Sequence, residues 1–384
     1  MNDTPRVYSI LPVVGNSTDS KRIAMLQEMG CRVEAAAFQR DFHSGRSPDC
    51  PVDLLCKISH GRYFNRLLKF ITVLHRIRRG IRRNDLVYAS APDLALLALL
   101  SGVGLGKPIF VEVQDLRSIQ VATGLKGIIA RLIDKFVINS CDLLIVTAPE
   151  FATEYYQKRL RVRTPSLLLE NKLEANNCPP VCSDPPNVQQ NYSTQPRRLR
   201  IGYFGVLRCE WSWQVLEALA RQFPDKVEIV IAGHPLFSID VARRAGELSN
   251  VTFLGPYQSP NDLPALYRNV DLVWACYPGP DEVDPDWRWA QAICRSNRFY
   301  ESCRFKRPLI SVQGSGDAAV VKRFDIGLIL EDQTLDAVVD ALLTIEADDL
   351  NRWQANMNKL PRDVYEYTTE KAELESAIRT RVAA

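Results

Sequence analysis

The sequence of 384 residues has no long hydrophobic run. Its longest apolar stretch, 94–105, is interrupted by a serine and two glycines, whereas a membrane-spanning helix needs about twenty apolar residues in succession. The first residues, 1–18, lack the basic start of a signal peptide and suit a first strand better. These absences predict a cytoplasmic protein.

The chain also lacks an excess of charge, with 48 Lys and Arg against 45 Asp and Glu, a formal net charge of +3. Nucleic-acid binding depends on Lys and Arg that neutralise phosphates, so this balance gives no global reason to expect a nucleic-acid partner. Any basic partner surface must be local. With 46% hydrophobic residues, the composition is that of a folded soluble protein.

Cysteines at metal-binding spacing are missing. The ten cysteines are far apart and several lie in apolar runs, which is typical of small buried side chains in a reducing compartment. The nearest two, Cys178 and Cys182, have no second Cys or His pair at zinc spacing. No metal site is therefore expected there.

The glycine-rich fingerprint of dinucleotide binding is absent too. The turn after the first expected strand contains one glycine, Gly15, and the segment 202–205 lacks the third glycine that close packing of the helix requires. A nicotinamide-dependent oxidoreductase is therefore disfavoured, and no cofactor is expected.

What the chain does contain is an alternation of short β-rich runs with helical patterns, which predicts parallel sheets covered by helices. In the first half we expect strands at 6–14, 31–38, 85–90, 108–113, 142–147 and 166–169. In the second half we expect strands at 200–205, 227–232, 251–254, 271–275, 308–312 and 327–330.

A polar, proline-rich stretch at 173–199 cannot bury a core and is predicted to be a linker. The fold class expected is α/β, with two Rossmann-like doubly wound domains at 1–172 and 200–360. A C-terminal helix at 361–384 would pack back on the first domain. The carboxyl ends of the two sheets would face a shared cleft, where such folds bind ligands.

The first strand of the second domain is expected to end in a turn at Gly205, with Arg208 three residues on. An arginine at the carboxyl end of this strand can reach a ligand in the cleft. The alternative is that Arg208 covers the helix expected at 211–221.

A second group of polar residues, Asn297, Arg298 and Glu301, lies on a helix that leads into the strand at 308–312. Asn297 and Glu301 are four residues apart and share a helix face. A glutamate there can accept two hydrogen bonds from a ribose diol. Alternatively, Glu301 is a solvated residue that pairs with Arg298 or Arg304.

The strand at 308–312 is followed by Gly314, Ser315 and Gly316. Small residues at a helix start let backbone N–H groups approach an anion, which favours a phosphate site. A simple turn is the alternative.

These elements resemble those of the GT-B glycosyltransferases, and specifically of the retaining family 4, over most of the chain. The similar segments are the Gly15 turn with Lys21-Arg22-Ile23, 85–88 with Pro92-Asp93, 111–116, 141–147, 169–172 and the Asn-Arg-Phe-Tyr-Glu helix at 297–301. The resemblance implies that Glu301 holds the nucleotide ribose and Arg208 a donor phosphate. The chain departs from the family at Ile293, where a glutamate is usual, and at Trp213, where a lysine is usual.

The resemblance implies a metal-independent, retaining hexosyltransferase. It would move a sugar from a nucleotide-sugar donor, which is a substrate and no cofactor, to a lipid-linked or polysaccharide acceptor in bacterial surface or exopolysaccharide synthesis. The first domain would be the acceptor side and the second the donor side.

Asp115 follows an apolar strand and is a candidate catalytic or acceptor-binding carboxylate, the general base if the enzyme is inverting. The alternative is an N-cap for the next helix. Asp284-Pro285-Asp286 resembles the metal-binding Asp-x-Asp of the other main glycosyltransferase fold, but it lies among tryptophans in an acidic stretch, and no metal is expected.

The segment 57–83 contains nine Lys or Arg and no acid. It has an apolar stripe at helical spacing (Leu67, Phe70, Ile71, Leu74, Ile77 and Ile81) and a basic face formed mainly by Arg66, Lys69, Arg76, Arg79 and Arg83. Such a helix can lie on an anionic membrane, with about 1 kcal/mol for each charge near the surface. It would place the protein peripherally on the inner membrane face, unless the stripe faces the core instead.

Two rival functions remain open. A nucleotide-sugar epimerase of related fold would use acid and base groups without an acceptor. A catalytically weak, membrane-docked partner of a transferase complex is suggested by Ile293 and Trp213 at positions where the family has a glutamate and a lysine.

Overall fold

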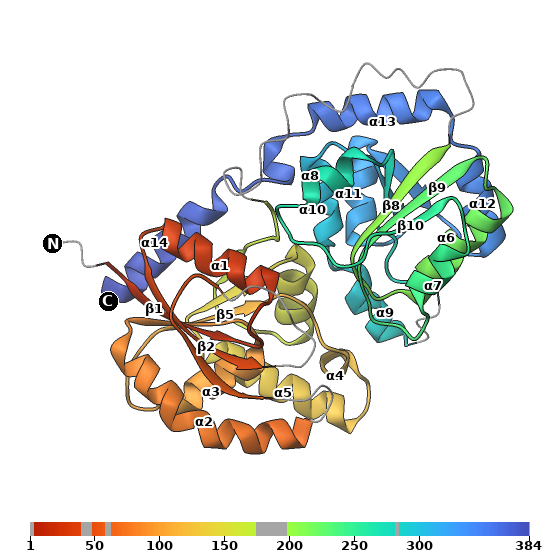
Figure 1. Cartoon of the computed structure of the whole chain (residues 1–384). Helices are drawn as coiled ribbons and strands as arrows, with labels where there is room; N and C mark the ends of the chain where they lie inside the picture. The colour runs from red at the N-terminus through yellow and green to blue at the C-terminus, as the bar shows by residue number, and fades with distance from the viewer. Residues whose placement is uncertain (1–3, 40–47, 58–62, 174–197, 281–283, 384) are drawn as a thin grey trace. The chain divides into compact units, whose positions relative to one another are not determined.

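The structure is a computed structural model that describes residues 4–39, 48–57, 63–173, 198–280 and 284–383. The chain forms two compact units: unit 1 comprises Met1–Glu170 with Thr369–Ala384, and unit 2 comprises Asn171–Thr368 (Figure 1). Each unit has its own parallel sheet. The linker expected at 173–199 lies almost wholly outside the described residues.

Unit 1 is built on a seven-stranded parallel sheet in the order β3-β2-β1-β4-β5-β6-β7. Its strands are β1 (Arg6–Leu11), β2 (Arg32–Gln39), β3 (Val52–Lys57), β4 (Leu86–Ala89), β5 (Ile109–Val113), β6 (Leu143–Val146) and β7 (Ser166–Leu168). Its helical segments are α1 (Ser17–Glu28), α2 (Tyr63–Arg83), α3 (Pro92–Gly102), α4 (Ser118–Val121), α5 (Leu125–Asn139), the π-helix η1 (Phe151–Arg159) and α14 (Glu370–Ala383).

Unit 2 is built on a six-stranded parallel sheet in the order β10-β9-β8-β11-β12-β13. Its strands are β8 (Leu199–Leu207), β9 (Val227–Pro235), β10 (Val251–Phe253), β11 (Leu272–Trp274), β12 (Leu309–Val312) and β13 (Gly327–Leu330). Its helical segments are α6 (Glu210–Gln222), α7 (Val241–Gly246), α8 (Leu263–Arg268), α9 (Pro285–Ala292), α10 (Asn297–Arg304), α11 (Gly316–Phe324), α12 (Leu335–Leu343), α13 (Ala347–Lys359) and the 3₁₀ turn η2 (Arg362–Val364).

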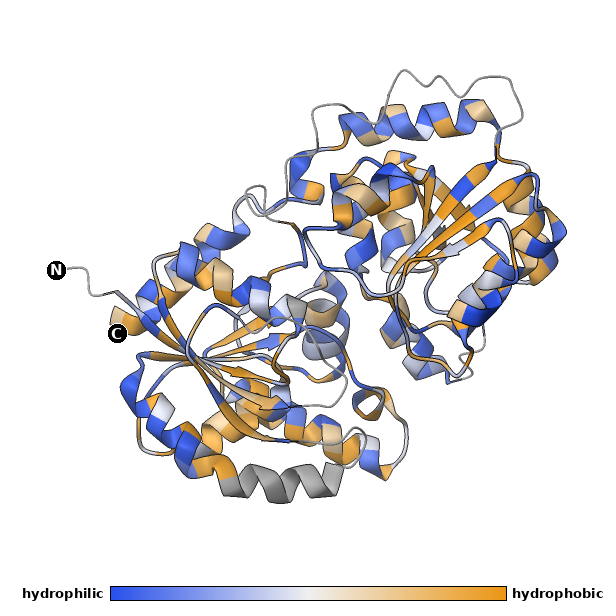
Figure 2. Ribbon diagram, viewed as in Figure 1, coloured by the Kyte–Doolittle hydropathy of each residue, from blue (hydrophilic) through white to orange (hydrophobic). Residues whose placement is uncertain are grey.

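Both units are Rossmann-like and doubly wound, as the sequence predicts. Strands β4, β5, β6, β11 and β12 are buried along their whole length, because helices cover both faces of each sheet. The strands are accordingly mainly hydrophobic in Figure 2. Unit 2 reverses its strand order between β8 and β11, and ligands bind beside such a switch point in doubly wound sheets.

Every strand expected from the sequence is present, and the described residues form one further strand, β3, that the sequence did not predict. This strand lies at the edge of its sheet and leaves most of its side chains partly or fully exposed. It therefore lacks the apolar run that marks the buried strands.

The turn expected at Gly205 is wrong. Strand β8 continues through Gly205 to Leu207 and pairs with β9 as far as Pro235. Gly205 has a φ of 107° and its partner Gly233 a φ of 138°. A Cβ atom on Gly233 would lie 1.7 Å from the carbonyl oxygen of Gly205, so glycine permits a close approach of the two strands here.

Helix α14 returns the chain to unit 1, where it packs beside β4 and β7. Leu374 and Ile378 are buried on its inner face. The Lys371 ammonium lies 2.8 Å from the Glu28 carboxylate at the end of α1. The last helix, α14, and the first helix, α1, are therefore neighbours in one unit (Figure 1).

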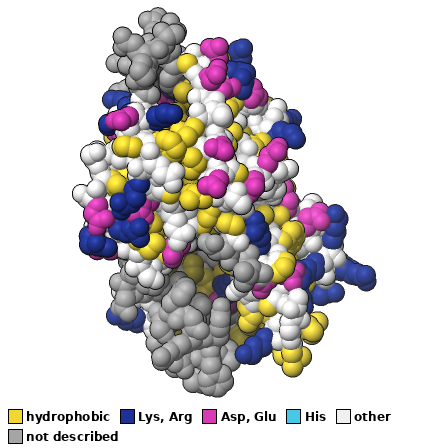
Figure 3. Space-filling view, turned by 90° about the vertical axis from the view of Figure 1, so that its right-hand side faces the viewer, with side chains coloured by type: hydrophobic (Ala, Val, Ile, Leu, Met, Phe, Trp, Pro, Cys, Tyr) yellow, Lys and Arg dark blue, Asp and Glu magenta, His cyan; other side chains and the backbone are white. Residues whose placement is uncertain are grey.

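The described surface carries mixed charges. Lys and Arg side chains alternate with Asp and Glu on much of the face shown in Figure 3, as the near-zero net charge implies. None of the helices in the described part of the chain has the length and apolarity required to cross a membrane.

Candidate functional site

The candidate site in unit 2 lies at the carboxyl edge of its sheet. Strands β8, β11 and β12 are neighbours there. Arg208 directly follows β8, and Gly314 follows β12 two residues after its end. The structure thus brings both groups to one edge of the sheet, beside the switch point.

Glu301 is a buried carboxylate of α10, with 5% of the residue exposed. Its Oε2 accepts a hydrogen bond of 2.8 Å from the hydroxyl of Tyr267, which is fully buried on α8. The alternative of a solvated glutamate is wrong because Glu301 is buried, and Arg304 pairs with Glu366 at 2.5 Å. A buried, oriented carboxylate is the kind of group that can accept hydrogen bonds from a diol.

The surroundings of Glu301 are aromatic. The Arg298 guanidinium lies 5.0 Å from the ring centroid of Tyr203, a cation–π distance. Burial, and then the Glu301 carboxylate, raise the pKa of Tyr257 and of Tyr267, so both phenols remain protonated donors at neutral pH. Asn297, the first residue of α10, is exposed and not buried with Glu301.

The start of α11 is open at Gly314, where φ is 81° and a Cβ would meet nothing within 4 Å. Ser315 caps the helix, since its hydroxyl accepts a hydrogen bond from the Ala318 N–H at 3.2 Å. Gly316 packs tightly, because a Cβ there would lie 3.1 Å from the carbonyl oxygen of Cys294 beyond the end of α9. The three small residues therefore have different local roles.

A buried carboxylate that was not among the expected site residues, Asp317, joins the starts of α10 and α11. The Asp317 side chain accepts a 2.7 Å hydrogen bond from the hydroxyl of Ser296, the N-cap of α10. Burial raises the pKa of Asp317 to about 6. This hydrogen bond links the helix that carries Glu301 to the helix that follows the Gly314 turn. The only sequence signal for it was an acidic residue in the first turn of a predicted helix.

Arg208 is exposed, and no other described residue forms a hydrogen bond or ion pair with it. Trp213, at the position where the resemblance to family 4 expects a lysine, is 1% exposed and belongs to the hydrophobic core. Ile293 is partly buried at the C-cap of α9. Trp213 is therefore a core residue of α6 and contributes no surface to the site.

In unit 1, Gly15 has a φ of 87° in the turn between β1 and α1. Asp115 is exposed, two residues after β5. The alternative of an N-cap is wrong, because Arg117 caps α4. Both residues thus lie at the carboxyl edge of the unit 1 sheet.

A buried polar cluster beside this edge was also missed. The Glu112 carboxylate accepts hydrogen bonds from Arg22 Nε at 2.8 Å and from the Tyr88 hydroxyl at 2.6 Å. Gln114 donates a 2.8 Å hydrogen bond to Asp19, and burial raises the pKa of Asp19 to about 7. A glutamate inside an apolar strand was the sequence signal that could have indicated this cluster.

In its described part, the basic segment 57–83 packs its apolar stripe inside the protein, whereas the sequence predicted a stripe that lies on a membrane. Side chains before Val73, including those of Arg66 and Lys69, lie outside the described residues. Ile77 and Ile81 are 0% and 1% exposed, so the apolar stripe faces the core here. Arg76 donates hydrogen bonds to the carbonyl oxygens of Leu54 and Leu55 at 2.9 Å and pairs with Asp53. Arg79 and Arg83 remain exposed.

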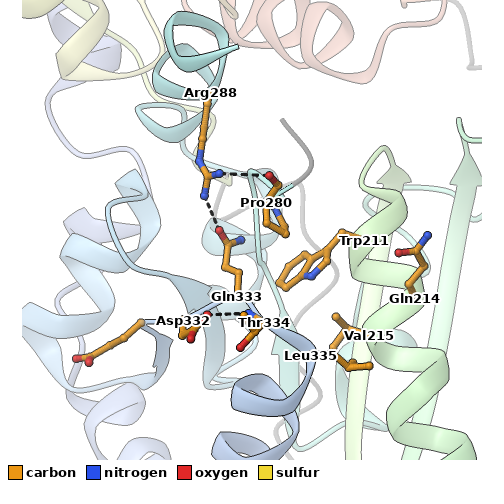
Figure 4. Close-up of a pocket in the computed structure, with 10 residues that line it drawn as sticks. Trp211, Gln214, Val215, Pro280, Arg288, Asp332, Gln333, Thr334 and Leu335 are labelled. Atoms are coloured by element: carbon orange, nitrogen blue, oxygen red, sulfur yellow. Dashed lines mark hydrogen bonds between the residues drawn. The ribbon is translucent and has the colours of Figure 1, made fainter. Parts of the chain in front are cut away.

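A pocket of 760 Å³ in unit 2 contains none of the residues expected from the sequence. Figure 4 shows Arg288 between Gln333 and Pro280, with hydrogen bonds of 2.6 Å to the Gln333 side chain and 3.5 Å to the Pro280 carbonyl oxygen. The indole of Trp211 forms another wall. A guanidinium, amides and an aromatic face suit a hydroxyl-rich ligand.

Asp284 belongs to the sequence Asp284-Pro285-Asp286, where no metal was expected. It is the N-cap of α9, and its side chain accepts a hydrogen bond from the Trp287 N–H at 3.0 Å. In the described ranges, no three His, Cys, Asp or Glu side chains are grouped so that they could hold a metal ion. The Cys178 and Cys182 pair lies outside those ranges.

No protein-family model matches the chain. The succinoglycan biosynthesis protein ExoL of Rhizobium meliloti (strain 1021) is 26% identical over 342 residues, which cover 84% of this chain and 80% of ExoL.

Solved structures match nearly the whole chain. Sucrose-phosphate synthase from Thermosynechococcus elongatus has a TM-score of 0.71 at 15% identity, with 98% of this chain and 99% of that chain covered. Anabaena HepE in complex with UDP and glucose has a TM-score of 0.69 at 15% identity, with 97% and 98% covered. Together with the two Rossmann-like units, these similarities show that the chain has the GT-B fold of glycosyltransferases.

Proposed function

We propose that this protein is a glycosyltransferase that moves a sugar from a nucleotide-sugar donor to a growing polysaccharide or lipid-linked acceptor in exopolysaccharide synthesis. The observation that carries the proposal is the buried Glu301 carboxylate, which accepts a hydrogen bond from Tyr267 in the unit whose sheet brings Arg208 and Gly314 to its carboxyl edge. The similarity to ExoL supports the polysaccharide class, and the HepE complexes with UDP and UDP-glucose support the donor class.

In this proposal Glu301 accepts hydrogen bonds from the ribose diol, and unit 2 is the donor side. The adjacent Arg298 is held over Tyr203 and lines the same region. Asn297, exposed at the start of α10, contributes to donor binding from the rim. The backbone at the partly buried Gly205 and the exposed Gly314, with the nearby Ser315 and Gly316, would face the diphosphate.

Arg208 has the central role in the chemical step. As the bond between the sugar and the diphosphate breaks, negative charge grows on the leaving phosphate. An exposed guanidinium just beyond β8 can stabilise that charge more in the transition state than in the ground state. The acceptor hydroxyl then forms the new glycosidic bond and loses its proton.

In this proposal unit 1 binds the acceptor. Asp115 at the end of β5 would contact the acceptor or take its proton, and Gly15 would let the acceptor approach the backbone between β1 and α1. Retention of anomeric configuration and independence from metal ions are part of the proposal, and both follow from the resemblance to family 4.

A lipid-linked acceptor would require the protein to bind at a membrane surface. The exposed arginines of the segment 57–83, Arg79 and Arg83 among them, would be attracted to an anionic surface on the inner membrane face. The weak-partner alternative retains one observation in its favour, Ile293 at the position where the resembling family has a glutamate.

The test is direct binding followed by product analysis. Thermal-shift and calorimetric titrations with UDP-, GDP- and ADP-sugars should identify one donor class, and NMR of the product should show an α- or β-linkage that matches the donor anomer. Failure of every nucleotide sugar to bind would favour the weak-partner alternative. A new sugar epimer formed without any acceptor would favour an epimerase.

A further inference from the structure

Helix α5 carries an apolar stripe on its solvent-facing side. The exposed residues are Leu125 (72%), Ile128 (46%), Ile129 (48%), Leu132 (62%), Ile133 (48%) and Phe136 (64%). Their spacing of three and one residues in alternation places them along one face of the helix. Single exposed apolar residues are ordinary, but a continuous stripe of this kind marks an interaction surface.

The opposite face of α5 is already packed, so the stripe is not a core face turned outward. Val137 and Ile138 are buried. Asp134 is buried as well and accepts hydrogen bonds from Gln120 at 2.8 Å and from Tyr155 at 3.2 Å. The helix therefore has a fixed rotation with its apolar stripe outside.

Helix α5 belongs to a basic layer. Helices α2, α3 and α5 lie side by side on one side of the unit 1 sheet (Figure 1). In sequence, α2 has seven Lys or Arg and α5 has three, whereas the three helices together contain two acids, Asp93 and Asp134. Asp93 pairs with Arg117 at 2.5 Å and Asp134 is buried. The layer therefore offers apolar and positive groups without exposed negative partners on α5.

The apolar surface extends onto the end of α3. Leu100 is 56% exposed and Val103 is 68% exposed. Arg78 of α2 donates hydrogen bonds of 2.8 Å to the carbonyl oxygens of Ser101 and Val103, which ties the basic helix to this end of α3.

We propose that the outer face of α5 docks unit 1 on an anionic lipid bilayer. The apolar stripe would enter the boundary between headgroups and acyl chains, and Lys126 and Lys135 beside it would lie near lipid phosphates. Helix α2 then supplies long-range attraction through its exposed arginines, whereas Ile77 and Ile81 of its own stripe are buried in the described part of the helix. This inference concerns unit 1 and does not rest on the proposed sugar transfer.

Charge favours a bilayer over a second copy of the chain. A symmetric dimer through this face would bring the same basic groups of two copies together, because an isologous contact places one patch on itself. An anionic surface instead complements both the charge and the flat apolar stripe.

The test is flotation of the full-length protein with vesicles of phosphatidylcholine, with or without phosphatidylglycerol. The wild type should float with the anionic vesicles, and a part of this binding should persist in high salt, which screens charge but not apolar insertion. The double variant Leu132→Gln/Phe136→Gln should bind at least about tenfold more weakly, because two polar amides replace apolar side chains that would otherwise be buried in the bilayer. The matched control, Leu236→Gln/Leu254→Gln, alters side chains of unit 2 that are 53% and 54% exposed and should float like the wild type.

Equal flotation of the α5 variant and the wild type would overturn the proposal, as would a wild type that binds no vesicles. Sedimentation without lipid provides a further check. A wild-type dimer that dissociates in the α5 variant would assign the face to a second copy and also overturn it. Vesicle binding needs no donor or turnover, so its failure is distinct from failure of the proposed function.

Discussion

The hydroxyl of Tyr267 lies 2.8 Å from a carboxylate oxygen of Glu301, and both residues are buried. The phenol comes from α8 and the carboxylate from α10, 34 residues later. Burial raises the pKa of Tyr267, and the carboxylate raises it further, so the phenol is a permanent donor at neutral pH. One oxygen of Glu301 is thereby held by the phenol, which fixes the orientation of the carboxylate.

Replacing Glu301 with glutamine should weaken nucleotide-sugar binding about tenfold or more, because hydrogen bonds to a charged acceptor contribute roughly 1.5–3 kcal/mol each. Calorimetry with the donor found by screening measures the change. Glu217→Gln is a matched control, since Glu217 is a buried carboxylate of the same unit that pairs with Arg221 and Arg244. It should lower stability without changing donor affinity. Equal donor affinity of Glu301→Gln and wild type would exclude Glu301 from the site.

Tyr267→Phe should reduce donor affinity less than the glutamate substitution does, by about threefold to tenfold, because the carboxylate remains but loses the hydrogen bond that orients it, worth about 0.5–1.5 kcal/mol. Tyr155→Phe removes a comparable buried hydroxyl, the one that donates to Asp134 in unit 1. Both variants should unfold at lower urea concentration than the wild type, and only Tyr267→Phe should change donor binding. An identical donor affinity in all three proteins would show that the phenol serves stability alone.

Arg208→Ala should lower turnover about a hundredfold or more with a smaller loss of donor affinity, since the guanidinium acts on charge that develops in the transition state. Arg208→Lys should recover only part of the rate, because an ammonium cannot reproduce the two-pronged hydrogen bonding of a guanidinium. Steady-state kinetics with the identified donor separate kcat from KM. Arg243→Ala, which changes an arginine on the surface of α7, is the control and should turn over normally. Normal turnover in Arg208→Ala would remove the residue from the mechanism.

The fold was predictable because buried parallel strands are uninterrupted apolar runs, as in Leu143–Val146. Strand β3 was not predicted, because an edge strand with exposed side chains has no such apolar run. The rotation of helices was not predictable. The stripes of α2 and α5 have the same periodicity, yet Ile77 faces the core and Leu132 faces solvent, and periodicity alone does not tell inside from outside.

The candidate site was predictable only in its individual residues. The position of Glu301 before a strand indicated a ligand-facing glutamate, but its partner Tyr267 comes from a short helix far away in sequence. The Asp317–Ser296 contact likewise depends on how two helix starts meet in space. Neither tertiary contact leaves a local pattern in the sequence.

Gly233→Ala should destabilise unit 2 severely, because the new Cβ would lie 1.7 Å from the Gly205 carbonyl oxygen in a backbone conformation with φ of 138°. Urea unfolding should show a loss of more than about 2 kcal/mol, or the variant should fail to fold. Gly255→Ala, at φ of 73° with nothing within 4 Å, tests backbone strain without a clash and should lose only about 1 kcal/mol. Similar losses in the two variants would mean that the β8–β9 approach is not as close as described.

Asp19 should make stability depend on pH. Its carboxyl is buried in the first turn of α1, and burial raises its pKa to about 7, whereas an unfolded aspartate titrates near about 3.9. Between these pH values the folded protein keeps a proton that the unfolded chain has released, so this group's contribution to stability falls as the pH rises and is lowest above about pH 7.

The variant Asp19→Asn removes the titration while retaining a polar side chain near Gln114. The variant should therefore gain urea resistance relative to the wild type at pH 8 and gain less at pH 5. Asp225→Asn, a change at a side chain that is 96% exposed, should follow the wild type at both pH values. If the difference between Asp19→Asn and wild type is the same at pH 5 and pH 8, the carboxyl of Asp19 does not carry a raised pKa in the folded protein.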